Sequence, residues 1–512
     1  MRRPRETALT PLHLLVVLSL SVGAVIWGIT FIRGGEGLQL QRYLALLGVY
    51  AASSTVFVVS RIRRGKLQLF DLPVFMTAMF FLQFGLLPLR NFIDPAQLAS
   101  NLSPDGEELG RALSYIMLGM MGFWIGCELV RRKKGERIPP GPGTQSTVPE
   151  GHKARALVLF AALFAVAFIT KFYLLKSQLF SYTASGEKYF ENLASMQVLN
   201  VVSQLGTLAL IIVAIERYRE RYDPFWRVLF VAVLLSEVCW GLISGMKGLV
   251  FQNFIVVALV SSFVKRRLNL RWLVIPLFAL VLLYPVSDAY RSLVRGGGVE
   301  VTSFEGGARA GQMAFSKIGE GESAAGDLWR EGLNHTLRRL DLLTSVAEVL
   351  SLGPRASMVK GDIHWWTLPF YPFVPRFLWP SKPILEEGGW FTVALRGGSE
   401  NVDSAGSSTA ITYPGDLYLQ FGLLGIPVGM FVLGVVAQWF TNRVSGRVES
   451  RDLFLYAALF LFGFPLEPDV FSMWTGLIKL LAILYVLRRL IYGPSAQHRR
   501  LATSFPVLAR RP

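Results

Sequence analysis

The sequence has few of the residue types that carry reactive side chains. Its 512 residues include only 2 cysteines, Cys127 and Cys239, and 5 histidines. Both cysteines fall in apolar runs that should lie at opposite membrane depths, so we expect no disulfide. No group of His, Cys, Asp or Glu has metal-ligand spacing, and neither a P-loop nor a serine nucleophile elbow occurs. The sequence therefore predicts chemistry without a metal or cofactor.

Charged residues are also scarce, at 17% of the chain, whereas hydrophobic residues make up 52%. The mean hydropathy of +0.43 is too high for a soluble protein of this length, and apolar runs of about 20 residues recur throughout. The net charge of +17 would suggest nucleic acid in a soluble protein, but here it marks membrane topology and attraction to anionic lipid. We expect no nucleic-acid partner.

The apolar runs predict an all-α polytopic membrane protein with about twelve transmembrane helices. The N-terminal run lacks a small-residue cleavage site, so we interpret it as a retained first helix. The predicted segments are 12–32, 43–60, 70–89, 112–130, 156–175, 198–215, 228–243, 249–264, 272–287, 416–440, 453–466 and 473–490.

The distribution of Lys and Arg predicts that both termini are cytoplasmic, because these residues concentrate in alternate short connections. One outer connection, residues 288–412, is long, nearly balanced in charge and rich in glycine, and should form an extracytoplasmic subdomain. The predicted sections are therefore helices one to nine (1–287), this loop subdomain (288–412), helices ten to twelve (413–490) and a cytoplasmic tail (491–512).

Within the long loop, the stretch "PRFLWPSKP" (375–383) is a proline-stiffened ribbon that cannot continue a helix. It carries Arg376 and Lys382 beside Trp379. Two fixed cations next to flat aromatic rings suit a ligand with phosphates and sugars, although Trp and Tyr also collect at headgroup depth in any membrane protein. A helical period over residues 328–350 predicts an amphipathic helix bearing His335, Arg339 and Asp341.

Further charged residues cluster on the predicted outer face. Arg291 and Arg295 follow the ninth segment, and Lys247 lies in the tight turn "SGMKG" between the seventh and eighth segments. Each cation could equally be an anchor that reaches the membrane surface. Asp416 stands at the outer mouth of the tenth segment as a base or a helix cap. Glu237 lies inside the seventh segment, where a carboxylate is either functional or paired with a neighbouring helix.

Four stretches resemble the O-antigen polymerase family (Wzy-type, oligosaccharide repeat unit polymerases). They are "YRSLVRGGG", "VPRFLWPSKP", "SSTAITYPGDLYLQFGLLGIPVGM" and "SGMKG". The family usually carries Arg in the last of these, whereas this chain has Lys247, which keeps the charge but lacks the guanidinium fork.

The resemblance implies a metal-independent glycosyltransferase of the bacterial inner membrane that polymerises undecaprenyl-pyrophosphate-linked repeat units for O-antigen, capsule or exopolysaccharide. The implied partners are a flippase and a chain-length regulator. Arg376 and Asp416 would be catalytic. Substrate-binding residues would be Arg291, Arg295, Lys382, Lys247, Arg339, His335 and Trp379. The alternatives are an O-antigen ligase type of transferase and a flippase or transporter of lipid-linked glycan.

The predicted topology can be tested with single cysteines and a membrane-impermeant maleimide applied to intact cells. We expect labelling from outside at positions 300, 361 and 400. Positions 134, 267 and 447 should react only after the membrane is permeabilised, because they lie in the Lys/Arg-rich connections. Labelling of position 267 in intact cells would overturn the orientation.

Overall fold

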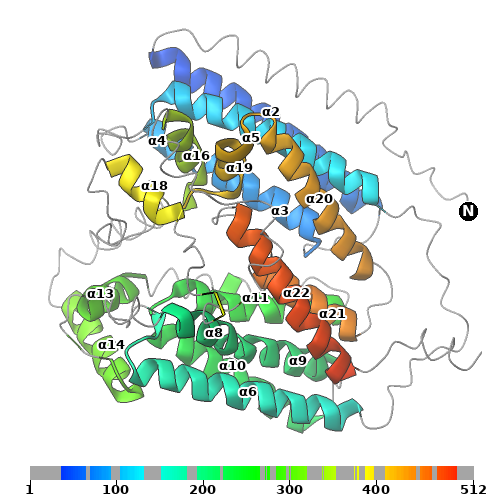
Figure 1. Ribbon diagram of the computed structural model, residues 1–512, viewed down its shortest axis with the longest axis vertical. Coiled ribbons are helices and arrows are strands. Elements are labelled where there is room, and N and C mark those ends of the chain that lie inside the picture. The colour runs from blue at the N-terminus through cyan, green and yellow to red at the C-terminus, as the bar shows by residue number, and fades with distance from the viewer. Residues whose placement is uncertain are drawn as a thin grey trace, which may run out of the picture. The chain divides into compact units, whose positions relative to one another are not determined.

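The computed structural model describes most of the helices and part of the connections. The described ranges are 36–64, 70–93, 104–131, 152–181, 193–219, 223–265, 271–272, 274–276, 284–295, 299, 301–319, 337, 340–352, 374, 378–379, 387–396, 410–444, 450–463 and 470–492. Every regular element in these ranges is helical (Figure 1). The predicted all-α class is therefore confirmed for the described part of the chain.

Within the described ranges, 9 helices are long and apolar enough to cross a membrane, and each overlaps a predicted segment. Of the other three predictions, residues 12–32 lie outside the described residues and 272–287 is described only in part. Residues 453–466 overlap α21 (Ser450–Phe462), an apolar helix of 13 residues. The polytopic membrane class is confirmed, and the total of about twelve segments stays a prediction.

The chain divides by packing into two compact units. Unit 1 comprises residues 1–136, 326–445 and 463–478, and unit 2 comprises residues 137–325, 446–462 and 479–512. The four sections predicted from the sequence (1–287, 288–412, 413–490 and 491–512) were defined by membrane topology and not by packing. They stay predictions.

Unit 1 contains a layer of long helices and a group of shorter ones. Its elements are α2 (Glu36–Arg64), α3 (Leu72–Phe81), the π-helical turn η1 (Leu82–Leu86), α4 (Leu89–Ile93), α5 (Gly106–Val130), α16 (Leu342–Ser351), α18 (Glu387–Arg396), α19 (Tyr413–Phe421) and α20 (Gly425–Val444). The short helices α16 and α19 pack together, and α16 also contacts α5 and η1. Tyr115 of α5 stacks on Tyr418 of α19, which places α19 against the N-terminal half of α5.

The closest packing in unit 1 joins α5 and α20 through glycines. A β-carbon on Gly122 would overlap the carbonyl oxygen of Pro427, and one on Gly126 would overlap that of Phe431. From the other side, a β-carbon on Gly434 would overlap the carbonyl of Phe123. The contacts advance along both helices in the same direction, so α5 and α20 run parallel. Small residues allow such close approach in membranes, where van der Waals packing stabilises helix pairs.

Unit 2 is built around α9 (Leu205–Arg219), which is buried continuously from Gly206 to Glu216. Helices α6, α10, α11 and α21 pack against it. The other elements of unit 2 are α6 (His152–Lys176), α8 (Leu193–Ser203), α10 (Pro224–Ile243), α11 (Lys247–Lys265), α13 (Tyr284–Arg295), α14 (Phe304–Gly319) and α21. Helix α22 (Val470–Tyr492) has residues in both units.

Helices α13 and α14 lie at one end of the unit 2 bundle (Figure 1). Ala310 and Ala314 form the buried face of α14 and share a core with Trp240 and Tyr290. The side chains of Glu305 and Arg309 on the opposite face are exposed. The small buried side chains let α14 pack closely across the bundle end, and its outer face exposes Phe315 and Met313 as well as the charged residues.

Two predicted helices are interrupted in the structure. The predicted segment 416–440 is divided into α19 and α20 at Gly422, whose φ of +68° is a conformation that glycine adopts without a steric penalty. The predicted helix 328–350 is broken at Asp341, whose side chain accepts the backbone N–H of Thr344 and begins α16. Asp favours this capping position over a helix interior, and the helical period alone does not reveal it.

The close approach of α5 and α20 predicts that stability depends strongly on the size of the side chain at their glycine positions. We expect Gly126→Leu to reduce the free energy of unfolding by about 1–3 kcal/mol or more, because the side chain must force the helices apart. The control is Gly110→Ala on the same helix, where a β-carbon meets nothing within 4 Å. Thermal unfolding in detergent should show a lower midpoint for Gly126→Leu alone, and equal midpoints would contradict the packing.

Candidate functional site

The structure describes only part of the predicted site. Asp416 and Trp379 lie in unit 1, and Arg291 and Lys247 lie in unit 2. Arg295 is the last residue of α13, but its side chain is outside the described part. Four other predicted residues lie outside the described residues: Arg376, Lys382, Arg339 and His335. Their predicted roles stay predictions.

Arg291 binds the turn that connects α10 and α11, and Lys247 follows this turn. Arg291 lies in α13 and donates from Nε to the carbonyl oxygen of Gly245 at 2.7 Å. Lys247 begins α11 two residues later. Both side chains are half-buried. The hydrogen bond thus places the Arg291 guanidinium beside the turn, two residues before Lys247 in the sequence.

Two further side chains hold the same turn. Tyr290 donates its hydroxyl to the carbonyl of Ile243 at 2.8 Å, and Ser181 donates to the carbonyl of Ser244 at 3.1 Å. Burial raises the pKa of Tyr290 to about 12, so its hydroxyl stays protonated and continues to donate at neutral pH. The turn is therefore fixed by hydrogen bonds from three residues far from it in sequence. Cations held beside a fixed turn suit binding of an anion.

Asp416 lies at the meeting point of two helix N-termini. It is in the first turn of α19, is 1% exposed, and accepts the backbone N–H of Val470, the first residue of α22, at 2.8 Å. Thr412, which caps α19, has a φ of +72°, an uncommon and strained value for a β-branched residue. Asp416 therefore acts as a helix cap, one of the two roles that the sequence left open. The helix that it caps is α22. The role of Asp416 as a base stays a prediction.

Two acidic residues lie two turns apart on α16. Asp341, the N-cap, is buried and accepts hydrogen bonds from Asn91 at 2.8 Å and from the Thr344 hydroxyl at 2.7 Å. Glu348 is half-buried near the other end of this helix, which is too short to span a membrane. Burial raises the pKa of Glu348 to about 8, and the nearby charge of Asp341 adds to the rise.

The sequence analysis did not single out Glu348. Glu348 is an acidic residue inside the apolar helical pattern that ends at residue 350. With about 3.6 residues per turn, Glu348 falls on the face of α16 opposite the buried Leu343 and Val346, so the apolar period does not indicate a perturbed carboxyl there. Its burial in the folded chain raises its pKa because water does not fully solvate the charge.

The buried carboxylate of Glu237 is paired with Lys171. Lys171 Nζ on α6 lies 2.7 Å from each carboxylate oxygen of Glu237 on α10. A β-carbon on Gly206 would overlap the Glu237 carboxylate, so the glycine leaves space for the pair beside α9. This bears out the reading in which Glu237 pairs with a neighbouring helix. The pair links α6 and α10 next to the central helix of unit 2.

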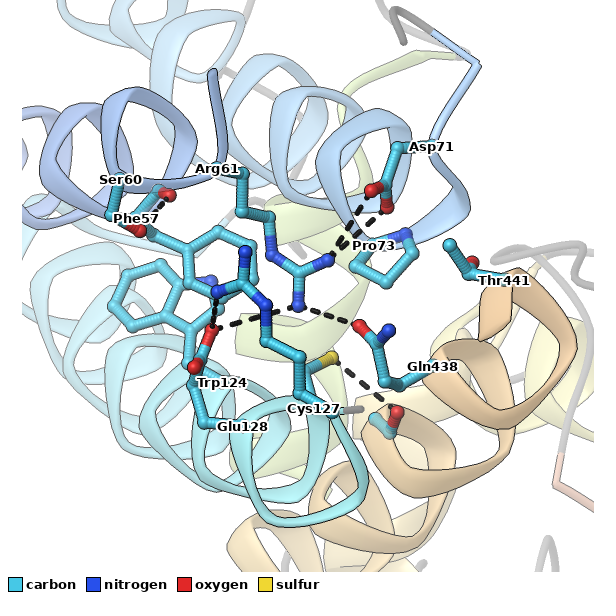
Figure 2. A network of polar contacts seen from close by, with 12 residues as sticks. Phe57, Ser60, Arg61, Asp71, Pro73, Trp124, Cys127, Glu128, Gln438 and Thr441 are labelled. Carbon is cyan, nitrogen blue, oxygen red and sulfur yellow. Dashed lines mark hydrogen bonds and ion pairs between the residues drawn. The ribbon is translucent and has the colours of Figure 1, made fainter. Parts of the chain in front are cut away.

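A second buried charge network lies in unit 1 and was not predicted (Figure 2). Arg61 at the end of α2 donates to both Asp71 oxygens at 3.2 and 3.4 Å and to Gln438 of α20 at 2.7 Å. Its guanidinium also lies over the ring of Phe57, 4.6 Å from the centroid. Glu128 of α5 lies 3.7 Å from Arg61. The network joins α2, α5 and α20 with the residue that precedes α3.

This network contains equal numbers of positive and negative groups. Arg131 pairs with Glu128 at 2.7 Å, so two arginines face two carboxylates. Gln438 donates to Asn442, which donates to the carbonyl of Val130 at 2.8 Å. Because the charges balance and the side chains are held on several helices, the cluster is suited to fixing helix positions.

Comparison with known families gives a match over the middle and C-terminal parts of the chain. The family model described as a domain of unknown function, DUF8712, matches residues 156–450, which is more than half of the chain. The chain belongs to this family. The match extends from the first turn of α6 to the start of α21. It therefore includes the α10–α11 turn, α16 and Asp416. No solved structure matches the chain.

Removal of the Arg61 side chain should leave a carboxylate inside unit 1 without its ion-pair partner. We expect Arg61→Met to reduce the free energy of unfolding by about 3–5 kcal/mol, because breaking one side of a buried ion pair leaves an uncompensated charge. Glu128 keeps Arg131 as a partner, so Asp71 is the stranded group.

The double variant Arg61→Met/Asp71→Asn should therefore recover part of the loss, which denaturant unfolding in detergent would measure. No recovery in the double variant would contradict the pairing of Arg61 with Asp71.

Proposed function

We propose that the protein is a glycosyltransferase of the bacterial inner membrane that extends a glycan carried on undecaprenyl pyrophosphate outside the cytoplasm. The proposal assigns it to O-antigen, capsule or exopolysaccharide synthesis. The growing glycan chain on undecaprenyl pyrophosphate is the glycosyl donor. A newly flipped repeat unit on the same type of carrier is the acceptor. A flippase and a chain-length regulator are the proposed protein partners.

The observation that carries the proposal is the hydrogen bond from Arg291 to Gly245. It joins the stretch "YRSLVRGGG" to the turn "SGMKG", which are two of the four stretches that resemble the polymerase family. The proposal assumes that cations far apart in the chain converge, and the hydrogen bond that brings Arg291 to the turn before Lys247 supports this assumption. The other supports are the polytopic helical architecture and the motif resemblance itself.

The proposed reaction needs a cationic clamp and a base. The acceptor hydroxyl oxygen attacks the anomeric carbon of the donor sugar, and the bond from that carbon to the pyrophosphate oxygen breaks. The pyrophosphate leaves with its lipid and carries the electron pair, so cations that meet the developing charge lower the barrier. The hydroxyl proton passes to a base on the protein.

The predicted residues divide between these roles. Arg376, Lys382, Arg291, Arg295 and Lys247 are the proposed cations. Trp379, which is half-buried, offers a ring on which a sugar can stack. Asp416 remains the base proposed from the sequence. Arg339 and His335 are the remaining proposed substrate contacts.

A ligase and a flippase are the competing functions. A ligase would share the proposed clamp and differ in its acceptor. A flippase needs polar groups along a central path, whereas Lys171 and Glu237 neutralise each other in the described part of unit 2. This contact favours a transferase over a flippase.

The surface-glycan ladder of a deletion strain separates the three functions. A polymerase mutant should display products with a single repeat unit. A ligase mutant should accumulate long chains on the lipid carrier, and a flippase mutant should retain repeat units on the cytoplasmic side. The proposal requires the first pattern, and either of the other two patterns would overturn it.

Substitution of Arg376 tests the clamp. We expect Arg376→Ala to lower single-turnover transfer by at least about 100-fold, as for loss of one strong donor to a developing negative charge. Arg376→Lys should be nearly as damaging because an ammonium group cannot grip two phosphate oxygens in parallel. Lys382→Arg should be milder.

Arg309→Lys on the exposed face of α14 provides the matched control and should leave the rate unchanged. Near-normal chain lengths from Arg376→Ala, at equal amounts of protein in the membrane, would rule out the clamp.

A further inference from the structure

Helix α14 has three distinct faces along its length. The face against the end of the unit 2 bundle is buried and consists of Gly307, Ala310 and Ala314. A second face is apolar and at least partly exposed, and we call it the apolar stripe: Phe304, Ala308, Gly311 and Phe315. A third face is polar and exposed: Glu305, Arg309, Gln312 and Ser316. Because residues three or four apart share one face of an α-helix, the polar face lies opposite the buried face and the apolar stripe lies between them on one flank.

The apolar stripe exposes two aromatic side chains. Phe315 is 69% exposed and Phe304 is 40% exposed. Met313, which is 41% exposed, lies alone on the opposite flank of the helix. Aromatic rings gain hydrophobic free energy only when they leave water, and apolar residues aligned beside a polar face are typical of a helix that contacts a membrane surface.

The contacts of α14 with α10 place it at a boundary of the membrane. Helix α10 is long and apolar enough to cross a membrane, and it ends at Ile243. A β-carbon on Gly307 would lie 3.4 Å from the Ile243 side chain. The ring of Phe304 lies 4.8 Å from that of Trp240, in the last turn of α10. A helix of about 20 residues needs its full length to cross the hydrocarbon core, so α14 lies where acyl chains meet headgroups.

The apolar stripe is connected to the lipid-facing side of α6. The ring of Trp240 contacts Phe304 of α14 and, at a centroid distance of 5.5 Å, Phe168 of α6. Helix α6 is a candidate membrane span, and Phe168, Ile169 and Phe172 are exposed on its surface. Lipid that covers this side of α6 therefore also reaches Phe304, the first residue of the apolar stripe. Trp is a residue that collects at this depth in membrane proteins.

We propose that α14 is a membrane-surface helix whose apolar stripe enters the bilayer at the level of the headgroups and upper acyl chains. Its polar face meets water, and its buried face holds it on the end of the bundle. The partner is a lipid surface, which the two Phe rings and the neighbouring polar face fit together. This inference does not depend on the proposed glycosyl transfer.

Spin labels on single cysteines distinguish lipid, water and protein around α14. The background variant is Cys239→Ala, which removes the exposed native thiol, whereas Cys127 is buried. Labels at positions 308 and 315 report on the apolar stripe, and labels at 309 and 312 report on the polar face. A label at the exposed position 231, near the middle of α10, is the control for the lipid interior. In phospholipid nanodiscs, collisions are measured with oxygen, which concentrates in lipid, and with a water-soluble nickel chelate.

The ratio of oxygen to nickel collisions should be several-fold higher at positions 308 and 315 than at 309 and 312. It should be higher still at position 231, because the apolar stripe lies at a shallower depth. Ready access of the nickel chelate to all four α14 positions would overturn the inference, because the stripe would then face water. Protection of 308 and 315 from both reagents would also overturn it, since protein would cover the stripe. A ratio there equal to that at 231 would place the helix too deep and would rule out its surface position.

A photoreactive phospholipid tests the protein without substitutions. Its diazirine group stands near the glycerol end of an acyl chain, and mass spectrometry locates the lipid adducts after digestion with trypsin. Cleavage after Arg309 and Lys317 isolates residues 310–317, which include Phe315. We expect adducts in this peptide, concentrated at Phe315. Adducts on the membrane spans with none in residues 304–317 would overturn the inference.

Discussion

The close contact between α5 and α20 is the constraint on which the rest of unit 1 depends. Because Gly122, Gly126 and Gly434 have no side chains, the two backbones approach until further atoms would overlap. This approach brings Gln438 within reach of Arg61 at one end of the pair. Toward the other end, α19 folds back on α20 so closely that a β-carbon on Gly429 would overlap the Leu417 side chain. Helix α16 packs against both α5 and α19. The buried charge network and α16 are thus both positioned by one glycine-lined interface.

Much of the membrane architecture could be predicted because it depends on local composition. A run of about 20 apolar residues must become a helix in lipid, where every backbone polar group needs an internal partner. The sequence also offered pairing with a neighbouring helix as one of two roles for Glu237, because an unpaired charge in the membrane is costly. The convergence of Arg291 and Lys247 was assumed from their places on the predicted outer face, and the hydrogen bond from Arg291 to Gly245 supports it.

Features that depend on contacts between distant segments could not be predicted from periodicity. The glycines of α5 look like helix-weakening residues until their contacts with α20 are known. Arg61 looked like a topology signal, yet it is buried and bound to Asp71 and Gln438. Asp341 fitted a continuous helical pattern, but its side chain accepts a backbone N–H and begins a new helix. In each case the decisive partner is remote in sequence or is a backbone group, and residue type alone does not identify it.

The most direct test of the account is reconstitution of the purified protein in liposomes with an isoprenoid-pyrophosphate-linked oligosaccharide as the sole substrate. The account predicts a product ladder whose sizes are integer multiples of the starting oligosaccharide. Free isoprenoid pyrophosphate should be released once per bond formed, as the cationic clamp expels the leaving group. Unchanged oligosaccharide size, with or without movement of the lipid across the bilayer, would contradict a polymerising transferase.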